Sequence, residues 1–152
     1  KDKKIFNKLH KKLPKYISSF PIKKTELTKA ILGNKTNLKK IISIVHEEVG
    51  KKLKLFLKKN KHKKIVVLDI PLLLENKINE KKDILIFVDS TTSNIEKKLK
   101  KRENFNRILY NKFKKIQFSK AYKKKKSNFI INNNFTKNSV KKGINRVLNQ
   151  IL

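Results

Sequence analysis

The sequence predicts an α/β protein of three layers, in which helices cover both faces of a parallel sheet. Three short apolar runs carry this prediction, at residues 65–70, 84–88 and 129–131. Unbroken runs of β-branched and apolar residues are typical of strands that are buried on both faces in a parallel sheet. Helical patterns precede, separate and follow these runs, and such alternation defines the three-layer α/β class.

The expected helices are marked by apolar residues that recur every three or four positions, most clearly at 37–59. Thr25 is expected to cap the second helix, and Gly33 to end it in the left-handed region. Ser93 and Glu96 form a capping box for the fourth helix. The expected helical segments are residues 3–13, 25–32, 37–59, 93–102, 104–126 and 136–152.

Lysine dominates the composition. The chain has 42 basic and 11 acidic residues, a formal net charge of +31, and only three of the basic residues are arginines. A chain of this charge would bind polyanions non-specifically. Specific reading of bases favours the planar fork of arginine, however, and the joint abundance of lysine, asparagine and isoleucine indicates AT-rich coding. The charge alone therefore assigns no function.

Cysteine usage and hydropathy narrow the class of protein. The chain has no cysteine, which excludes a disulfide scaffold and fits a reducing cytoplasm. No apolar run is longer than six residues, far short of a membrane span. With 152 residues, the chain fits one domain. We expect a cytoplasmic protein that binds neither a membrane nor a specific nucleic acid, and we favour a monomer.

Three motifs follow one another in a recognisable order. Residues 69–75 read Asp-Ile-Pro-Leu-Leu-Leu-Glu and resemble the Asp-hydrophobic-Pro-Leu-Leu-Phe-Glu signature of dephospho-CoA kinases. Residues 98–102 resemble the family's Arg-Leu-x-x-Arg, with Lys98 replacing the first arginine and Arg102 matching the second. Residues 127–133 resemble its Ala-Asp-x-Val-Ile-x-Asn. No single motif is diagnostic, but the ordered set is.

Smaller matches extend the resemblance over nearly the whole chain. Residues 24–27 resemble the family's Arg-x-x-Leu at the start of a helix, and His46-Glu47 stands where the family has His-Pro. Gln117 is followed six positions later by the basic residue Lys123, as in the family. The chain is thus similar to dephospho-CoA kinases from its first helices to its last strand.

The resemblance implies a P-loop kinase of the nucleotide-kinase-like group. Its activity would be ATP-dependent phosphorylation of the 3′-hydroxyl of dephospho-CoA, the last step of coenzyme A biosynthesis, with Mg²⁺ bridging the phosphates. It also implies that residues 1–152 form one incomplete P-loop kinase domain. The expected parts are a helical acceptor-substrate part, core strands, a lid, and the last strand with the C-terminal helix, at residues 1–62, 63–90, 91–127 and 128–152.

Basic residues of the expected lid are the candidate catalysts. The resemblance implies that Arg102, Lys98 and Lys123 place positive charge over the transferring phosphate. For most lysines of this stretch, a solvated basic face is the other interpretation. The family's acceptor-side aspartate, the expected base for the ribose hydroxyl, has no counterpart in the sequence. The general base is therefore unknown.

The remaining candidates would bind nucleotide or substrate. Asp69, at the tip of the first strand, would hold a water on Mg²⁺ or cap a turn. Asn133 would lie beside the adenine ring or be a plain turn residue. His46 would line the acceptor pocket or pack on its helix. The resemblance also assigns three residues of the 69–75 motif to the substrate, namely Pro71, Leu72 and Glu75.

The phosphate-binding loop of such kinases, Gly-x-x-x-x-Gly-Lys-Ser/Thr, does not occur in the sequence. Gly50-Lys51 is followed by another lysine and lies in a helical pattern. In related kinases the strand before this loop lies between the strands expected at 65–70 and 84–88, so these would lose their shared neighbour. We therefore expect the 152 residues to be a fragment that is inactive on its own.

Three other interpretations stay open. Another small-molecule kinase, such as a nucleoside monophosphate kinase, would share the fold but usually carries a more arginine-rich lid. A basic nucleic-acid-binding protein would need clustered arginines or exposed aromatic rings, whereas we expect the nine phenylalanines mostly on apolar stripes. A non-catalytic paralogue would keep the fold as an interaction module.

Overall fold

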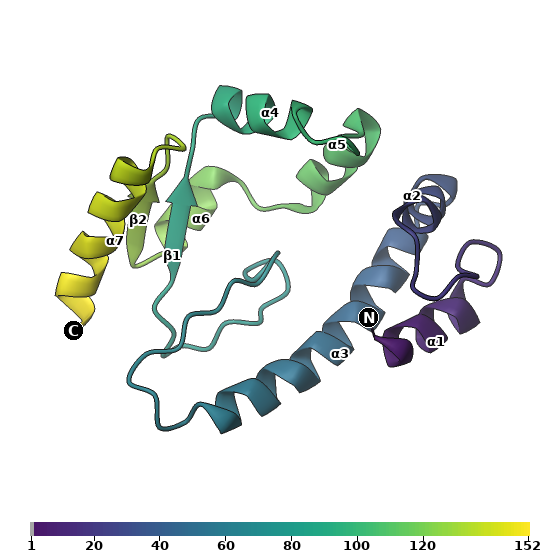
Figure 1. The fold of residues 1–152 in the computed structure, drawn as a ribbon, viewed down its shortest axis with the longest axis horizontal. Coiled ribbons are helices and arrows are strands. Elements are labelled where there is room, and N and C mark those ends of the chain that lie inside the picture. Colours follow the sequence, from purple (N-terminus) through teal and green to yellow (C-terminus); the bar gives the residue numbers. More distant parts are fainter. Residues whose placement is uncertain (1) are drawn as a thin grey trace. The chain divides into compact units, whose positions relative to one another are not determined.

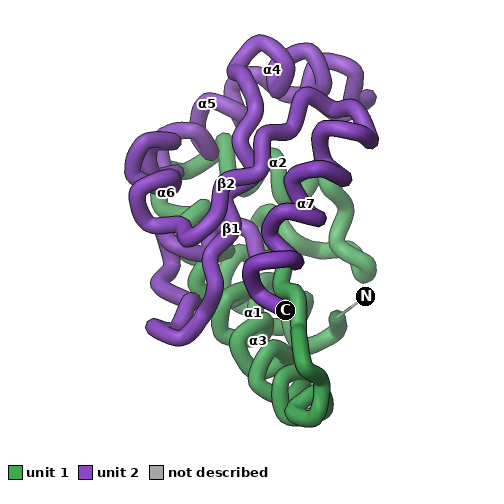
Figure 2. The backbone as a smooth tube through the Cα atoms, turned by 90° about the vertical axis from the view of Figure 1, so that its left-hand side faces the viewer, with its two compact units in different colours: residues 1–69 green, residues 70–152 purple. Residues whose placement is uncertain are grey.

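The computed structural model describes residues 2–152 and divides the chain into two compact units. Unit 1 is Lys1–Asp69 and unit 2 is Ile70–Leu152 (Figure 2). Unit 1 is helical, whereas unit 2 contains a small parallel sheet with helices around it (Figure 1). The predicted α/β class and the parallel pairing of strands are therefore confirmed.

Unit 1 consists of α1 (Lys3–Lys12), α2 (Lys24–Gly33) and α3 (Asn37–Lys59). Helices α1 and α2 both pack against α3. Asp2 caps α1, because its side chain accepts hydrogen bonds from the backbone N–H groups of Lys4 and Ile5. The helices expected at 3–13 and 37–59 are thus confirmed, and the second predicted helix forms as well.

The core of unit 1 lies where these helices meet. Leu9 and Ile17 are fully buried, and Asn37 is buried with its amide donating to the Ala30 carbonyl at 2.9 Å. That hydrogen bond satisfies a buried polar group at the start of α3. The other buried apolar side chains of unit 1 are Leu13, Ala30, Ile31, Leu38 and Ile41.

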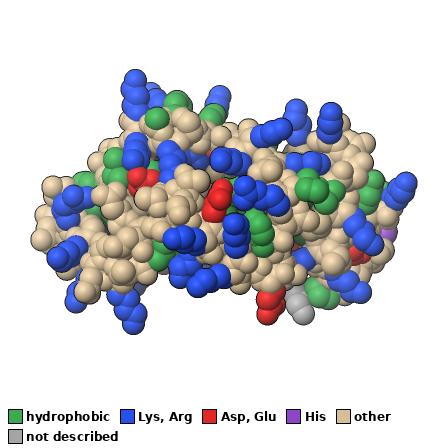
Figure 3. Space-filling view, turned by 90° about the horizontal axis from the view of Figure 1, so that it is seen from above, with side chains coloured by type: hydrophobic (Ala, Val, Ile, Leu, Met, Phe, Trp, Pro, Cys, Tyr) green, Lys and Arg blue, Asp and Glu red, His purple; other side chains and the backbone are tan. Residues whose placement is uncertain are grey.

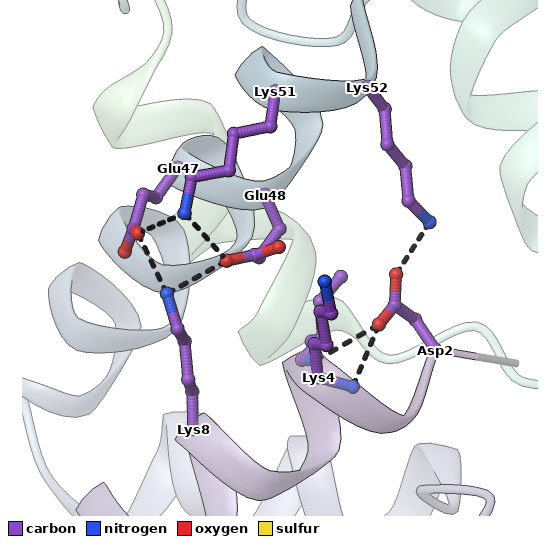
Figure 4. A network of polar contacts seen from close by, with 8 residues as sticks. Asp2, Lys4, Lys8, Glu47, Glu48, Lys51 and Lys52 are labelled. Carbon is purple, nitrogen blue, oxygen red and sulfur yellow. Dashed lines mark hydrogen bonds and ion pairs between the residues drawn. The ribbon is translucent and has the colours of Figure 1, made fainter. Parts of the chain in front are cut away.

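A polar network joins α1 to α3 (Figure 4). The Nζ atom of Lys8 lies 2.7 Å from Glu47 Oε1 and 2.8 Å from Glu48 Oε1. Lys51 completes the network from the next turn of α3, 2.8 Å from Glu47 Oε1. Hydrogen bonds from Lys51 and Lys8 lower the pKa of Glu47 to about 2. The two helices are therefore linked by charge as well as by apolar packing.

Unit 2 is built on two parallel strands, β1 (Ile86–Asp89) and β2 (Phe129–Asn132). Ile86 pairs with Phe129 and Asp89 pairs with Asn132, so both strands end at the same edge. Three helices connect them, α4 (Thr92–Lys100), α5 (Arg107–Ile116) and α6 (Lys120–Lys126). The last helix is α7 (Lys137–Ile151). Two of the three predicted strands are therefore confirmed, with β1 shorter than expected.

Helix α7 packs closely on β2 through a glycine. A Cβ atom on Gly143 would lie 2.6 Å from Cγ2 of Ile131. The helix can therefore approach the strand this closely because residue 143 has no side chain. Ile131 and Val147 are buried at this contact, and the guanidinium of Arg146 donates to the Ile130 carbonyl at 2.7 Å. This contact fixes the helix that follows β2 and with it the loop between them.

The strand predicted at 65–70 does not form. A strand requires ladder hydrogen bonds to a neighbour, and within residues 2–152 the sheet contains only β1 and β2. Val67 is 83% exposed in this segment, and Ile86 and Val88 of β1 are 43% and 56% exposed. The apolar pattern at residues 65–70 is typical of a strand, but no segment within residues 2–152 pairs with it.

Several predicted helix boundaries are wrong. Thr91, rather than Ser93, caps α4, because its hydroxyl is in reach of the Asn94 N–H. Lys23, rather than Thr25, is the N-cap of α2. Gly33 has no positive φ but is the last residue of α2, where a Cβ would lie 2.6 Å from Tyr16 Oη. Gly33 thus leaves room for the Tyr16 ring and does not provide a left-handed stop.

The helical stretch expected at 104–126 is divided into α5 and α6. Asn106 caps α5 and Ser119 caps α6, each through a side-chain oxygen that accepts from a backbone N–H. The phenylalanines expected mostly on apolar stripes are only partly covered in the structure. No phenylalanine is in the buried core of residues 2–152, and Phe20, Phe118 and Phe135 are exposed.

Charge is spread widely over the surface. Lysine and arginine side chains lie over the whole visible face, with few acidic ones between them (Figure 3). In the described part of the chain, no helix combines the length and apolar character needed to cross a membrane.

Candidate functional site

The carboxyl ends of β1 and β2 form the centre of the candidate site. The Asn133 N–H donates to the Asp89 carbonyl at 2.7 Å, which extends the strand pairing into the loops that follow. Only two residues separate the end of β1 from the start of α4. In open α/β sheets, ligands bind outside the carboxyl ends of the strands. This edge is therefore where unit 2 is best arranged to bind a ligand.

Asn133 lies in the loop between β2 and α7, as the sequence predicts. Its Oδ1 accepts from the Phe135 N–H at 2.7 Å, in a turn that places Phe135 at a φ of 66°. Both residues line an open hollow of about 440 Å³. The hollow is completed by Thr136, Lys137, Val140, Lys141, Ile144 and Asn145 of the loop and α7.

Lys98 of α4 lies beside this loop. Its ammonium lies 5.3 Å from the centre of the Phe135 ring, a cation–π distance. The contact joins α4 to the loop after β2, so Lys98 and Asn133 are brought to the same side of the site.

Arg102 lies in the turn that follows α4. Its N–H donates to the Leu99 carbonyl at 3.0 Å, and its own carbonyl accepts from the Phe105 N–H at 2.9 Å. The side chain is exposed and makes no ion pair within residues 2–152. Arg102 is therefore a cation whose charge is available to an incoming anion.

Residues 70–77 form a compact turn at the start of unit 2. Leu72 has a φ of 57° and Lys77 a φ of 52°, and the Leu72 carbonyl accepts from both the N–H and the amide side chain of Asn76. Pro71 is exposed and Leu72 is half-buried. This turn points one side chain of the motif, Glu75, toward α6.

Glu75 and Lys123 form an ion pair, with Nζ and Oε1 2.8 Å apart. The same carboxylate accepts from the Phe118 N–H at 2.8 Å. Burial alone would raise the pKa of Glu75, but the hydrogen bonds from Lys123 and the Phe118 N–H outweigh it and lower the pKa. The structure thus brings together two residues that the sequence assigns to different roles, one to the substrate and one to catalysis.

Asp89 is a residue of this edge that the sequence analysis did not single out. Its carboxylate lies 2.6 Å from Lys124 Nζ and 3.4 Å from Lys120 Nζ, and Lys120 also donates to the Ser90 carbonyl. The hydrogen bond from Lys124 lowers the pKa of Asp89. Its place directly after the apolar run 84–88 is the signal that could have identified it.

His46 and Asp69 belong to unit 1. His46 is half-buried on α3, next to Glu47 of the polar network, and Asp69 is the exposed last residue of the unit. The other predicted site residues belong to unit 2. The structure therefore groups Asn133 with Lys98 through Phe135, and Glu75 with Lys123. Arg102 makes only local backbone hydrogen bonds, to Leu99 and Phe105, among those that the described residues show.

The described residues do not form a metal site by themselves. Within residues 2–152, no three histidine, aspartate or glutamate side chains lie together. A Mg²⁺ ion that arrives with a nucleotide needs only one or two carboxylates, because the phosphates supply other ligands.

A parallel sheet with basic helices around it defines the chain as an α/β protein. The dephospho-CoA kinase family model matches residues 1–139. The chain belongs to the dephospho-CoA kinase family.

Curated relatives agree with this assignment. The dephospho-CoA kinase of Wolbachia pipientis wMel is 33% identical over 141 residues, which is 91% of this chain and 72% of that protein. The enzyme of Bartonella quintana is 28% identical over 134 residues, covering 87% of this chain and 69% of the relative. The enzyme of Fusobacterium nucleatum is 32% identical over 113 residues, covering 74% and 58%.

Proposed function

We propose that this protein is an ATP-dependent kinase that phosphorylates the 3′-hydroxyl of dephospho-CoA. The observation that carries the proposal is the family match over residues 1–139. It is supported by the motif at 69–75, whose glutamate contacts α6, and by the Asn133 loop at the carboxyl edge of the sheet. We also propose that the parallel pair β1–β2 belongs to a three-layer P-loop sheet, and that the enzyme is a cytoplasmic monomer.

The proposed roles of the site residues follow from their environments. Phosphoryl transfer requires mainly positioning and neutralisation of charge on the phosphate oxygens. Arg102 supplies that charge, since its exposed guanidinium can contact two oxygens at once. Asn133 serves the adenine side of the nucleotide from the loop after β2. Lys98 adds a second, weaker positive charge for the phosphate from α4, next to that loop.

Within unit 2, the motif residues Pro71 and Leu72 are proposed to contact the acceptor. ATP carries Mg²⁺ on its phosphates, where the ion supplies further neutralising charge. Asp69, an exposed carboxylate, is the residue proposed to hold a water of that ion. The residue that removes the proton from the 3′-hydroxyl is not among those assigned.

A coupled assay of ADP release tests the proposal. The protein, expressed from its complete reading frame, is given ATP with dephospho-CoA, AMP, CMP or pantothenate as the acceptor. We expect turnover with dephospho-CoA alone. Turnover of a nucleoside monophosphate without turnover of dephospho-CoA would identify a different small-molecule kinase and overturn the proposal.

A further inference from the structure

Helix α6 is unusual in having three of its lysines matched to acids elsewhere in unit 2. Lys123 contacts Glu75, and Lys120 and Lys124 both contact Asp89. Acids are scarce in this chain, with 11 against 42 basic residues. There are therefore too few acids for most lysines to form an ion pair. Three ion pairs on one short helix indicate that α6 is attached specifically to the segments that carry Glu75 and Asp89.

Glu75 holds the start of α6. Its side chain is only 8% exposed, and it accepts from Lys123 and from the N–H of Phe118, which directly precedes the N-cap Ser119. One carboxylate thus fixes both the chain that enters the helix and the first turn of the helix itself.

Asp89 contacts the same helix from the carboxyl end of β1. It is the last residue of β1, and its carbonyl accepts from the Asn133 N–H. Its Oδ1 atom is buried without a hydrogen bond in residues 2–152 and lies 3.4 Å from Lys120 Nζ. A buried carboxylate oxygen in this position favours retention of the lysine charge nearby.

We propose that Glu75 and Asp89 are positioning residues for α6: Glu75 links the helix to the turn at residues 70–77, and Asp89 links it to the carboxyl edge of the sheet. Together they fix the point where the lid region, residues 91–127, returns to the sheet. This inference rests on the proposed kinase function. Lys123 is then neutralised by Glu75, Lys120 and Lys124 share the single negative charge of Asp89, and Arg102 remains to contact the phosphate. Lys123, which the sequence assigns to catalysis, acts instead through the placement of the lid.

A double-mutant cycle tests the assignment, using Glu75→Gln, Lys123→Met and the double variant in the protein made from its complete reading frame. Removing one partner of a largely buried pair leaves the other charge uncompensated, whereas removing both does not. We expect the two single changes to lower kcat by similar factors, about tenfold for a coupled pair. The double variant should be no slower than the slower single variant. Lys125→Met, an exposed lysine of the same helix, is the control and should leave kcat unchanged.

A different pattern would overturn the proposal. If Lys123→Met lowered kcat far more than Glu75→Gln, and the two effects multiplied, Lys123 would act on the phosphate directly. Unchanged kcat in all variants would also contradict the proposal that these residues position α6. If Glu75→Gln does not fold, Asp89→Asn with Lys124→Met provides the same cycle on the second attachment.

Amide hydrogen exchange gives a readout that needs no turnover. We expect Glu75→Gln to accelerate exchange at Phe118 and along α6, while β2 and α7 keep wild-type protection. Unchanged exchange in α6 would overturn the attachment even in an active kinase. Failure to phosphorylate dephospho-CoA would refute the proposed function and leave this measurement to decide the attachment by itself.

Discussion

Arg102 offers a guanidinium that no described acid neutralises, in a turn that follows a short lysine-rich helix. Phosphate oxygens gain and redistribute negative charge as the phosphoryl group transfers, so a cation placed on them is worth most in the transition state. We expect Arg102→Ala to lower kcat by on the order of 10³-fold, the effect of losing such a cation in related phosphoryl transfers. The KM for dephospho-CoA should change far less. Steady-state kinetics with both substrates measure the two effects separately.

Lys98→Ala and Lys101→Ala provide the comparison for this prediction. Lys98 lies over the Phe135 ring, and an ammonium makes only a point contact, so its removal should lower kcat much less. Lys101 is an exposed neighbour of Arg102 and should be neutral. If all three variants kept wild-type kcat, Arg102 and Lys98 would be part of a solvated basic surface.

At the scale of secondary-structure elements, we expect replacement by alanine to have opposite effects on stability at two glycines in helices. Gly143 of α7 faces the buried Ile131, whereas a Cβ on Gly50 of α3 would meet nothing within 4 Å. Alanine gains up to about 1 kcal/mol over glycine in a helix, and overpacking costs about 1–3 kcal/mol. The cost should prevail at Gly143, because a β-branched side chain in a core cannot rotate away easily. We expect Gly143→Ala to lower the free energy of unfolding and Gly50→Ala to raise it.

Urea unfolding of the two variants beside the wild type checks this pair. Gly50→Ala serves as the matched control, since it makes the same chemical change in a helix without the close contact. Equal stabilisation by both substitutions would mean that α7 can move away from β2 at little cost.

The network between α1 and α3 predicts a dependence of stability on pH. The pKa of Glu47 falls from its ordinary 4.5 to about 2, because Lys51 and Lys8 donate hydrogen bonds to it. A carboxyl with a lowered pKa stabilises the folded state above its unfolded pKa, and this contribution disappears as the pH falls through the folded pKa. Wild type should therefore be more stable than Glu47→Gln at pH 6, and the difference should vanish between about pH 4.5 and 2.

Thermal unfolding of both proteins over this pH range measures the difference. The Glu47 side chain is half-exposed, so high salt should also reduce it. Glu103→Gln, which removes an exposed carboxylate outside the network, controls for the change in net charge. A difference that persisted at pH 2 would show that Glu47 contributes through packing.

The sequence predicted helices better than strands, for a physical reason. An amphipathic helix such as 37–59 makes its backbone hydrogen bonds within itself, so its apolar period is enough to define it. A strand needs a partner that its own residues do not specify, and the run at 65–70 has none in the described chain. Caps were less predictable, because Thr91 and Ser93 are equally good candidates by residue type and only the backbone decides between them.

The location of a candidate site residue was predictable where it depends only on the order of strands and loops along the chain. Asn133 follows β2 as expected, since the residue after an apolar run reaches the carboxyl edge. The pairing of Glu75 with Lys123 was not predictable, because the two lie 48 positions apart and any of several lysines could have met the carboxylate. Asp89 was missed for the same reason, since its importance depends on Lys120 and Lys124.

At the scale of the whole molecule, the two units differ in the size of their cores. Among the described residues, buried apolar side chains are numerous in unit 1, whereas only Ile131 and Val147 are buried in unit 2. Apolar burial is the main source of stability. Unit 2 therefore depends more on polar attachments, of which the pairs on α6 are the most concentrated.

The surface charge is the other property of the whole molecule, and it makes a prediction about nucleic acids. With a net charge of +31 the protein should bind DNA and RNA, and lysines contacting phosphates release counterions, so affinity should fall steeply with salt. Only three arginines are present, and they are the residues best suited to bidentate contacts with guanine. The exposed rings of Phe118 and Tyr122 could stack on unpaired bases, but stacking tolerates any sequence. We therefore expect a random-sequence duplex to compete as well as any chosen duplex of equal length, measured at two salt concentrations. A preference of roughly 10³-fold for one sequence, the lower limit for specific binders, would contradict this prediction and favour a nucleic-acid function.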